Sequence, residues 1–308
     1  MKILIELPTW LGDTVMVTPS IENIVRNFNN VEITIIGSIV SIEVLKNHPN
    51  VHKIMLLDKG YISIYKIARS LGKFDKFFSF RSSWRSNILK LLVTSEHKYQ
   101  FSKAKYQKKH QVEKYNNFIN DSMNINTIAG KLILHFEKKS KDDKNKLLGI
   151  NPGASYGSSK RWYPKEFANL ASDLSAMYDI IIFGGLDEKD IARDIEKYLI
   201  EKGVHNYQNL AAKTSIAELI SQIANLDLFI TGDSGPMHIA AAFKIPTVAI
   251  FGPTNDKETS QWMNQKSKVV KKNLECQPCM KRSCPLTHHN CMKLVKASDV
   301  LGAVKTFN

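Results

Sequence analysis

Residues Thr231–His238, with the sequence TGDSGPMH, place hydroxyl, carboxylate, glycine and imidazole groups at a predicted helix start. An apolar stretch at 226–230 precedes them and predicts a strand, and a second apolar stretch follows at 247–251. Pro236 favours the first turn of a helix, with Ser234 as its N-cap. A strand–turn–helix–strand unit directs free backbone N–H groups toward an anion at the edge of a parallel sheet. The pattern therefore predicts a site for a phosphate-bearing ligand, and an ordinary loop without a ligand is the alternative.

Strands and helices alternate along the rest of the chain, which predicts parallel sheets with right-handed crossovers. The expected strands are 2–7, 31–36, 51–57, 74–80, 147–150, 179–183, 226–230 and 247–251, and the expected helices are 18–28, 39–47, 62–71, 88–93, 164–177, 188–202 and 215–224. The pattern weakens at 99–144, and Lys138–Lys146 is the linker candidate. We therefore expect two α/β domains, 1–146 and 147–308, with a ligand cleft between them. The last helix is a candidate for packing back on the N-terminal domain.

Composition limits the class of protein. The 308 residues carry a formal net charge of +14, and between Lys98 and Lys146 there are 12 lysines against 5 acidic residues. An excess of this sign indicates an anionic partner, such as nucleic acid, an anionic membrane surface or a phosphorylated substrate. No apolar run reaches the roughly 18 residues that span a bilayer, and the first residues read as a strand instead of a secretory signal. We expect a cytoplasmic protein.

Three segments, in this order, resemble glycosyltransferase family 9, the ADP-heptose:lipopolysaccharide heptosyltransferases. They are Gly12-Asp13, the KRWYP segment Lys160–Pro164 and the DSGPMH segment Asp233–His238. The resemblance covers nearly the whole chain and implies an α/β fold of the GT-B type. In that architecture two Rossmann-like domains with parallel sheets face a central cleft, with the acceptor on the N-terminal domain and the nucleotide sugar on the C-terminal one. The resemblance also implies an inverting transfer that needs no metal ion or other cofactor.

An inverting transfer requires a base that takes the proton of the acceptor hydroxyl. Asp13, after the first strand, matches the family's catalytic aspartate, and the alternative is that Asp13 only caps the segment that follows. Lys160 matches the family's phosphate-binding lysine, which would offset negative charge on the departing ADP. Ser155 matches a hydroxyl that touches the same phosphates. A solvated surface lysine is the alternative for Lys160.

The remaining donor-site expectations follow the same motifs. Ser234 and Gly235 would bring helix N–H groups to the pyrophosphate, and Asp233 would bind sugar hydroxyls or orient Lys160. Glu188 lies where the family uses an acid on the adenosine ribose, although a helix-start glutamate explains it equally well. Three further residues are predicted donor contacts with less specific roles. Thr214 would contact the base, and Met237 belongs to the motif. His238 would contact the phosphate or the sugar, and a packed core histidine is its alternative.

For the acceptor, the candidates are Gly12, Arg81 and Arg85. Two arginines after the predicted strand at 74–80 would bind the carboxylates and phosphates of an anionic lipid. Surface arginines without a ligand are the alternative. The lysine excess described above would help the protein to dock at an anionic membrane face.

Four cysteines occur close together near the C-terminus, at Cys276, Cys279, Cys284 and Cys291, with His288 and His289 beside them. One C-x-x-C pair with two further thiols is compatible with a structural zinc site, although the spacing is tighter than in paired zinc knuckles. A disulfide and reduced packing thiols remain the alternatives. Stable disulfides are uncommon in cytoplasmic proteins.

The resemblance implies a glycosyltransferase that moves L-glycero-D-manno-heptose from ADP-heptose to the lipopolysaccharide or lipooligosaccharide inner core. The Cys-rich C-terminal segment favours transfer of the second heptose. The expected partners are ADP-heptose, an anionic lipid A–Kdo inner-core acceptor and the cytoplasmic face of the inner membrane, as a peripheral monomer without nucleic acid. The alternatives within enzymes are transfer of the first heptose and a GT-B enzyme for a UDP-sugar. In another class, a basic nucleic-acid-binding protein with a zinc ribbon would use Tyr99, Phe101, Tyr106 and Tyr115 as stacking groups.

Overall fold

The computed structural model describes residues 1–58, 60–136, 145–153 and 156–307. The chain divides into two units, Met1–Phe136 (unit 1) and Glu137–Asn308 (unit 2). This division falls ten residues before the predicted boundary at 146, and most of the predicted linker lies outside the described residues. Each unit has its own sheet and hydrophobic core.

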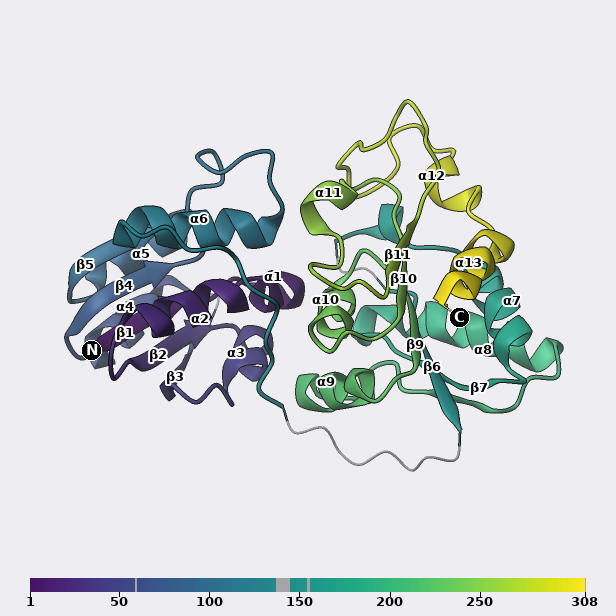
Figure 1. The fold of residues 1–308 in the computed structure, drawn as a ribbon, viewed down its shortest axis with the longest axis horizontal. Helices are drawn as coiled ribbons and strands as arrows, with labels where there is room; N and C mark the ends of the chain where they lie inside the picture. Colours follow the sequence, from purple (N-terminus) through teal and green to yellow (C-terminus); the bar gives the residue numbers. More distant parts are fainter. Residues whose placement is uncertain (59, 137–144, 154–155, 308) are drawn as a thin grey trace. The chain divides into compact units, whose positions relative to one another are not determined.

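Unit 1 is built on a parallel sheet with the strand order β3-β2-β1-β4-β5 (Figure 1). Its strands are β1 (Lys2–Glu6), β2 (Glu32–Gly37), β3 (Val51–Leu56), β4 (Phe74–Ser79) and β5 (Ser95–Gln100). In the central strand, Ile3 lies in register with Ile33 of β2 and Lys76 of β4. The inner strands are almost continuously apolar because helices cover both faces of the sheet.

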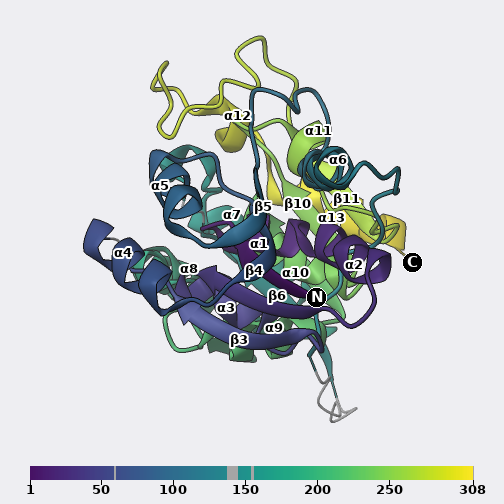
Figure 2. The same cartoon turned by 90° about the vertical axis from the view of Figure 1, so that its left-hand side faces the viewer.

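The helices of unit 1 are α1 (Leu11–Met16), α2 (Thr18–Asn27), α3 (Ile39–Leu45), α4 (Tyr61–Ser70), α5 (Trp84–Leu92) and α6 (Gln111–Met123). Figure 2 shows α4 and α5 on one side of the strands and α2 and α6 on the other. Ile64 and Ile67 of α4 and Leu89 of α5 enter one core cluster with Leu4 and Phe77 of the sheet. Helix α6 lies in the stretch where the sequence pattern is weak, and β5 ends at the beginning of that stretch.

Unit 2 repeats the design with the strand order β11-β10-β9-β6-β7-β8, again parallel throughout. The strands are β6 (Lys146–Asn151), β7 (Tyr178–Ile182), β8 (Tyr207–Asn209), β9 (Leu228–Gly232), β10 (Thr247–Ile250) and β11 (Ser267–Val270). The first strand of each unit thus lies beside the strand where the chain changes direction across the sheet, β4 in unit 1 and β9 in unit 2. Ligands of open α/β sheets bind at this switch point, beyond the carboxyl ends of the strands.

The helices of unit 2 are α7 (Pro164–Leu174), α8 (Lys189–Glu201), α9 (Ile216–Ala224), α10 (Gly235–Ala242), α11 (Asp256–Thr259), α12 (Asn290–Lys293) and α13 (Ala297–Val304), with short 3-10 turns at Ser158–Lys160, Leu186–Glu188 and Lys305–Phe307. The last helix contacts α7, β10 and β11 of its own unit. Val300 and Val304 of α13 are part of the unit 2 core, which explains this position.

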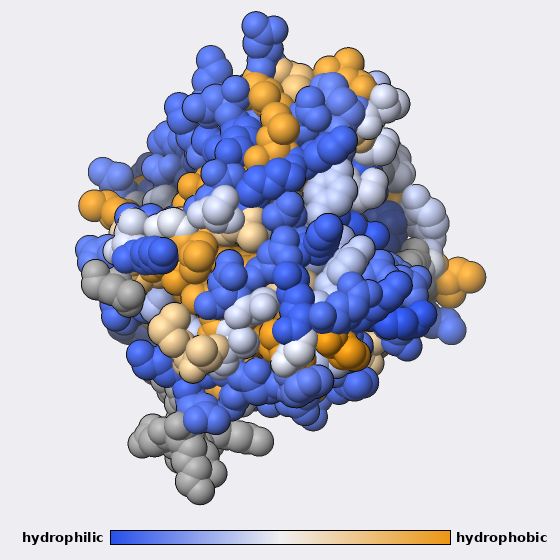
Figure 3. Space-filling model, turned by 90° about the vertical axis from the view of Figure 1, so that its right-hand side faces the viewer, coloured by the Kyte–Doolittle hydropathy of each residue, from blue (hydrophilic) through white to orange (hydrophobic). Residues whose placement is uncertain are grey.

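The α/β class and the two parallel sheets are as predicted. Among the described residues, no helix is long and apolar enough to cross a membrane. The face shown in Figure 3 is mostly hydrophilic, with apolar side chains in separate spots.

Candidate functional site

At the carboxyl end of β9, Lys160 and Asp233 form a closely spaced ion pair. Lys160 Nζ lies 2.5 Å from Asp233 Oδ2 and 3.3 Å from the Asp233 carbonyl oxygen. The Thr254 hydroxyl donates to the same carboxylate oxygen across 2.7 Å. The Lys160 side chain is 11% exposed and that of Asp233 is 6% exposed. Lys160 also lies over the Tyr156 ring, 4.7 Å from its centroid, so the ammonium group is held from several sides at the switch point.

The start of α10 adds backbone donors at the same sheet edge. Ser234 occupies the N-cap position, as predicted, but its side chain makes no capping bond. Its hydroxyl instead lies 3.0 Å from Thr231 Oγ1 and accepts from Asn151 Nδ2 across 3.2 Å. The first N–H groups of α10, beginning at Gly235, are therefore not used by the Ser234 hydroxyl. A helix N-terminus whose first N–H groups are not capped by a side chain favours an anion.

Glu188 lies at the ends of β6 and β7 and is only 5% exposed. Its Oε2 accepts from the Gly185 N–H across 2.7 Å, and its Oε1 lies 3.7 Å from Arg161 Nη2. A side chain at Gly153 would place Cβ 2.4 Å from Glu188 Cγ, so glycine is required there. The bond from Gly185 is the capping-box bond of the 3-10 turn Leu186–Glu188, and Glu188 is the N-cap residue of α8, so the helix-start interpretation also fits these contacts.

The other predicted donor residues differ in their surroundings. Met237 is completely buried and packs with Ala249 and Phe251, so its side chain belongs to the core. His238 is also buried, and Thr214 lies half-buried just before α9. Ser155 lies outside the described residues.

In unit 1, Asp13 lies in the first turn of α1, which begins two residues earlier than Asp13. The sequence predicts a turn at this point, so the helical position of Gly12 and Asp13 is a correction. The N-cap is Trp10, and Asp13 does not cap the following segment. The Tyr115 hydroxyl donates to Asp13 Oδ1 across 3.3 Å. Burial of Tyr115, and secondarily the Asp13 charge, raises the pKa of Tyr115 well above its usual value, so the phenol stays a neutral donor.

Glu6, at the end of β1, binds polar side chains from β4, α5 and the segment between them at the switch point of unit 1. It is 1% exposed, and its carboxylate accepts from Ser79 Oγ at 2.5 Å and Ser86 Oγ at 2.9 Å. Arg81 Nη1 lies 3.5 Å from Glu6 Oε1. Burial raises the pKa of Glu6 although both hydroxyls and Arg81 act to lower it. Arg85 donates to the Asp58 carbonyl oxygen across 2.6 Å. Both predicted acceptor arginines thus have intramolecular partners that orient them.

Sequence reasoning missed Thr254, Tyr115 and Glu6. Thr254 follows β10, the neighbour of β9, so the GPT segment after an apolar strand was an available signal. Glu6 is a carboxylate closing an apolar strand, a second available signal. Tyr115 contacts Asp13 from 102 positions away, and no local pattern identifies such a contact.

The aromatic residues of the nucleic-acid alternative have another role. Phe101, Tyr106 and Tyr115 are 2%, 9% and 3% exposed. Phe101 has ring-centroid distances of 5.7 Å to Tyr106 and 5.0 Å to Tyr115. These rings form a core under α6 and are not available to stack on bases.

Comparisons with known proteins address the family and the fold of the chain. A family model described as glycosyltransferase family 9 (heptosyltransferase) matches residues 65–290. The chain is 44% identical to lipooligosaccharide heptosyltransferase 2 of Campylobacter jejuni serotype O:2, over 99% of this chain and 98% of that protein. Its fold matches the structure of E. coli ADP-heptose LPS heptosyltransferase II, with a TM-score of 0.83, 21% identity and coverage of 100% and 98%. It also matches E. coli heptosyltransferase WaaC with ADP, with a TM-score of 0.79, 14% identity and full coverage of both chains.

The family model covers more than half of the chain, and the alignment with the Campylobacter protein covers nearly all of it. The chain belongs to glycosyltransferase family 9, the heptosyltransferase family.

Proposed function

We propose that this protein transfers L-glycero-D-manno-heptose from ADP-heptose to the inner core of lipopolysaccharide or lipooligosaccharide, as the second heptose. The observation that carries the proposal is the Lys160 cation at the carboxyl end of β9, beside the start of α10, in a chain 44% identical to a heptosyltransferase 2. A fixed cation and helix N–H groups suit a leaving diphosphate.

On unit 1, Asp13 acts as the general base. Its carboxylate takes the proton of the acceptor hydroxyl as the oxygen attacks the anomeric carbon. The bond from that carbon to the β-phosphate oxygen breaks, and ADP leaves with the electron pair, so the configuration inverts. Tyr115 orients Asp13 through the hydrogen bond to Oδ1.

On unit 2, Lys160 and the N–H groups at Ser234 and Gly235 stabilise the charge that develops on the β-phosphate. Asp233 and Thr254 position Lys160, because the carboxylate accepts from both. A lone carboxylate would repel a pyrophosphate, but the ion pair with Lys160 offsets the negative charge of Asp233.

Glu188 binds the adenosine ribose hydroxyls, since a buried acid after a β-strand of a Rossmann-like unit suits a diol. Thr214 contacts the base, and His238 contacts the phosphate or sugar from the first turn of α10. Ser155 keeps its predicted role toward the phosphates.

Gly12, Arg81 and Arg85 serve the acceptor at the switch point of unit 1. Guanidinium groups bind carboxylates and phosphates with two parallel hydrogen bonds, which suits an anionic inner-core lipid. Glu6 and the Asp58 carbonyl hold the two arginines in place before the acceptor arrives.

The surface of α4 and α5 supports the proposal of peripheral docking on the cytoplasmic membrane face. Five large apolar side chains on these two helices are at least half exposed. They are Tyr61 (58%), Ile62 (72%), Tyr65 (50%), Trp84 (73%) and Leu91 (79%). Lys66, Arg69 and Lys90 belong to the same helices. Aromatic and aliphatic groups mixed with cations are typical of helices that lie in a membrane interface.

The docking surface is tested by sedimentation with vesicles of anionic and of neutral lipid. Binding to anionic vesicles should weaken with salt, and the double variant Trp84→Ser/Leu91→Ser should bind at least about tenfold less. Leu186→Ser is the matched control, because Leu186 is 75% exposed on unit 2. Equal binding by the double variant and the control would exclude α4 and α5 as the docking surface.

The reaction is tested with purified protein, ADP-heptose and inner-core acceptors that end in one heptose or in Kdo, followed by mass spectrometry of the lipid. We expect the mass of one heptose to be added to the acceptor that already carries one. Addition only to the Kdo-terminated acceptor would show first-heptose transfer. In a thermal-shift assay ADP should stabilise the protein and UDP should not. The reverse preference would indicate a UDP-sugar enzyme.

A further inference from the structure

The segment between β11 and α12, residues 271–289, contains no helix or strand. Connections of this length without regular structure are uncommon in compact domains and usually have a function or a specific tether. This segment carries Cys276, Cys279 and Cys284, and Cys291 follows in α12. All four cysteines are free thiols. Neither the transfer reaction nor the donor site described above uses them.

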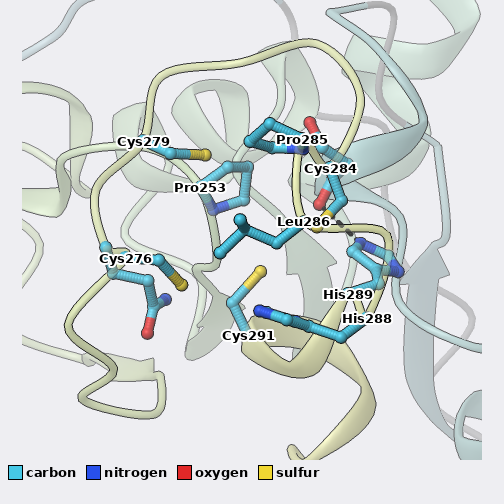
Figure 4. A pocket seen from close by; sticks show the side chains of 11 residues that line it. Pro253, Cys276, Cys279, Cys284, Pro285, Leu286, His288, His289 and Cys291 are labelled. Atoms are coloured by element: carbon cyan, nitrogen blue, oxygen red, sulfur yellow. Dashed lines mark hydrogen bonds between the residues drawn. The ribbon is translucent and has the colours of Figure 1, made fainter.

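The thiols surround one small cavity of about 20 Å³, together with His288 and His289 (Figure 4). Cys276 and Cys279 approach from one side, Cys284 from the other, and Cys291 from α12. A volume of this size accommodates about one water-sized species.

We propose that Cys276, Cys279, Cys284 and Cys291 form a structural zinc site. Four thiolates are the donor set that Zn²⁺ prefers in closed tetrahedral sites, and Cys276 and Cys279 have the C-x-x-C spacing of such ligands. The ion binds the thiolates while their protons pass to solvent, with no change of oxidation state. His288 and His289 line the same cavity and would shield the site.

The ion must draw the thiols inward. In a tetrahedral zinc–thiolate site the sulfurs lie about 3.8 Å apart, as follows from a Zn–S distance of about 2.3 Å. Over the described ranges, Glu22, His48 and His135 form the one group of three or more ligands with all donor atoms within 4.8 Å of one another. The thiols are therefore more widely spaced than in a bound site. A segment without regular secondary structure can close over an ion at little cost in hydrogen bonds.

The tighter histidine cluster is explained without a metal. Glu22 Oε1 lies 3.3 Å from His48 Nε2 and 3.2 Å from His135 Nε2, which are direct pairing distances. His48 Nδ1 accepts from the Asn50 N–H across 3.1 Å. A neutral His48 therefore carries its proton on Nε2, the atom that faces Glu22, and offers no lone pair there.

The zinc site has a consequence for the donor site, and this step rests on the proposed function. Ser159, the residue before Lys160, is held by the thiol-bearing segment on three atoms. Its N–H donates to the Arg282 carbonyl across 3.1 Å, its hydroxyl donates to the Lys281 carbonyl across 2.6 Å, and His289 Nε2 lies 2.8 Å from its carbonyl oxygen. Zinc that fixes this segment also fixes the turn that presents Lys160.

The primary test measures metal in the full-length protein, purified under reducing conditions, by elemental mass spectrometry. We expect about one zinc per chain, falling below about a tenth in Cys276→Ser/Cys279→Ser. The matched control is His48→Gln, which disrupts the histidine cluster and should keep its zinc. Zinc that is lost from the His48 variant and kept by the cysteine variant would overturn the proposal.

A second measurement does not depend on the folding of a variant. Wild-type protein refilled with Co²⁺ should show thiolate-to-cobalt charge-transfer bands and the intense visible absorption of a tetrahedral site. Failure of metal-free wild-type protein to take up Zn²⁺ or Co²⁺ would refute the site. An intact mass lower by two hydrogens per bridge under denaturing, non-reducing conditions would show disulfides instead.

The link to Lys160 is tested by ADP binding before and after zinc removal from the wild-type chain. We expect ADP affinity to fall at least about tenfold when zinc is removed and to return when zinc is restored. Stoichiometric zinc in a protein that never binds ADP would leave the metal site standing and count against the proposed function. Unchanged ADP affinity after zinc removal would refute the link.

Discussion

The Tyr115 hydroxyl donates a hydrogen bond to Asp13 Oδ1 across 3.3 Å, joining α6 to the first turn of α1. Tyr115 is 3% exposed and also packs edge-on against Phe80. The ring is thus fixed by the core while its hydroxyl reaches the carboxylate. The orientation of the proposed base is therefore set by the packing of unit 1 and not by α1 alone.

Tyr115→Phe should keep the ring packing and lose the bond to Asp13, together with the interaction of the hydroxyl with the Gln111 side chain. We expect kcat to fall about tenfold, the equivalent of one hydrogen bond of about 1.4 kcal/mol, with KM little changed. Tyr106→Phe is the matched control, because its hydroxyl donates to Asp121 and not to Asp13. Steady-state kinetics of both variants measure the effect. If Tyr115→Phe and Tyr106→Phe have the same kcat, Tyr115 does not position Asp13.

Asp13→Asn should abolish turnover while leaving the fold intact. The amide has nearly the same shape but cannot take the acceptor proton, so we expect kcat to fall by at least about 10³-fold. ADP affinity should stay within about twofold, because Asp13 lies in unit 1 and the proposed ADP contacts lie in unit 2. Circular dichroism and ADP titration supply the controls. Substantial activity in a folded Asn variant is the result that excludes Asp13 as the base.

Lys160→Ala should weaken both donor binding and stability. Removal of the ammonium leaves the buried Asp233 carboxylate with Thr254 and costs about 3 kcal/mol in the free energy of unfolding. We expect ADP affinity to fall at least about tenfold. Denaturant unfolding and ADP titration measure the two effects.

The double variant Lys160→Met/Asp233→Asn separates these effects. It should regain stability, because no unpaired charge remains buried, but not ADP affinity. Lys165→Ala, an exposed lysine at the start of α7, should be neutral in both assays. Normal ADP affinity in Lys160→Ala would contradict a phosphate role.

Glu22→Gln should reveal a pH-dependent contribution to stability. Hydrogen bonding from His48 lowers the pKa of Glu22 from 4.5, against the effect of burial, and His135 acts in the same direction. The folded pKa is thus below the unfolded pKa. The stabilisation is therefore present above the unfolded value and is lost as the pH falls through the folded value.

We expect the wild type to exceed Glu22→Gln by about 1 kcal/mol in the free energy of unfolding near neutral pH. The difference should shrink as the pH falls below the unfolded value of 4.5. Urea unfolding at several pH values gives the curve. A difference that grows toward acid pH would reverse the assigned sign.

Local patterns in the sequence predicted most of the sheets because buried parallel strands are continuous apolar runs and their helices have a clear period. Ile33 to Ile36 and Leu228 to Ile230 are of this kind. The same reasoning missed the edge strands β5, β8 and β11 and the helix α6. Strand β5 is a half-buried edge strand with the sequence SEHKYQ, and the apolar positions of α6 lie among Lys, Asn and Asp. Edge position and a polar context hide the period.

The candidate site shows the same division. The sequence by itself determined which chemical groups follow the strands, because glycine and proline mark the turns where strands end. These groups are Asp13 after β1, Lys160 after β6 and Asp233 after β9. Only the tertiary structure decided their partners, Tyr115, Thr254 and, for Arg81, Glu6. The physical reason is that parallel strands adjacent in a sheet are separated in the chain by whole crossover helices. Contacts at their shared edge therefore follow from strand order, which residue spacing does not encode.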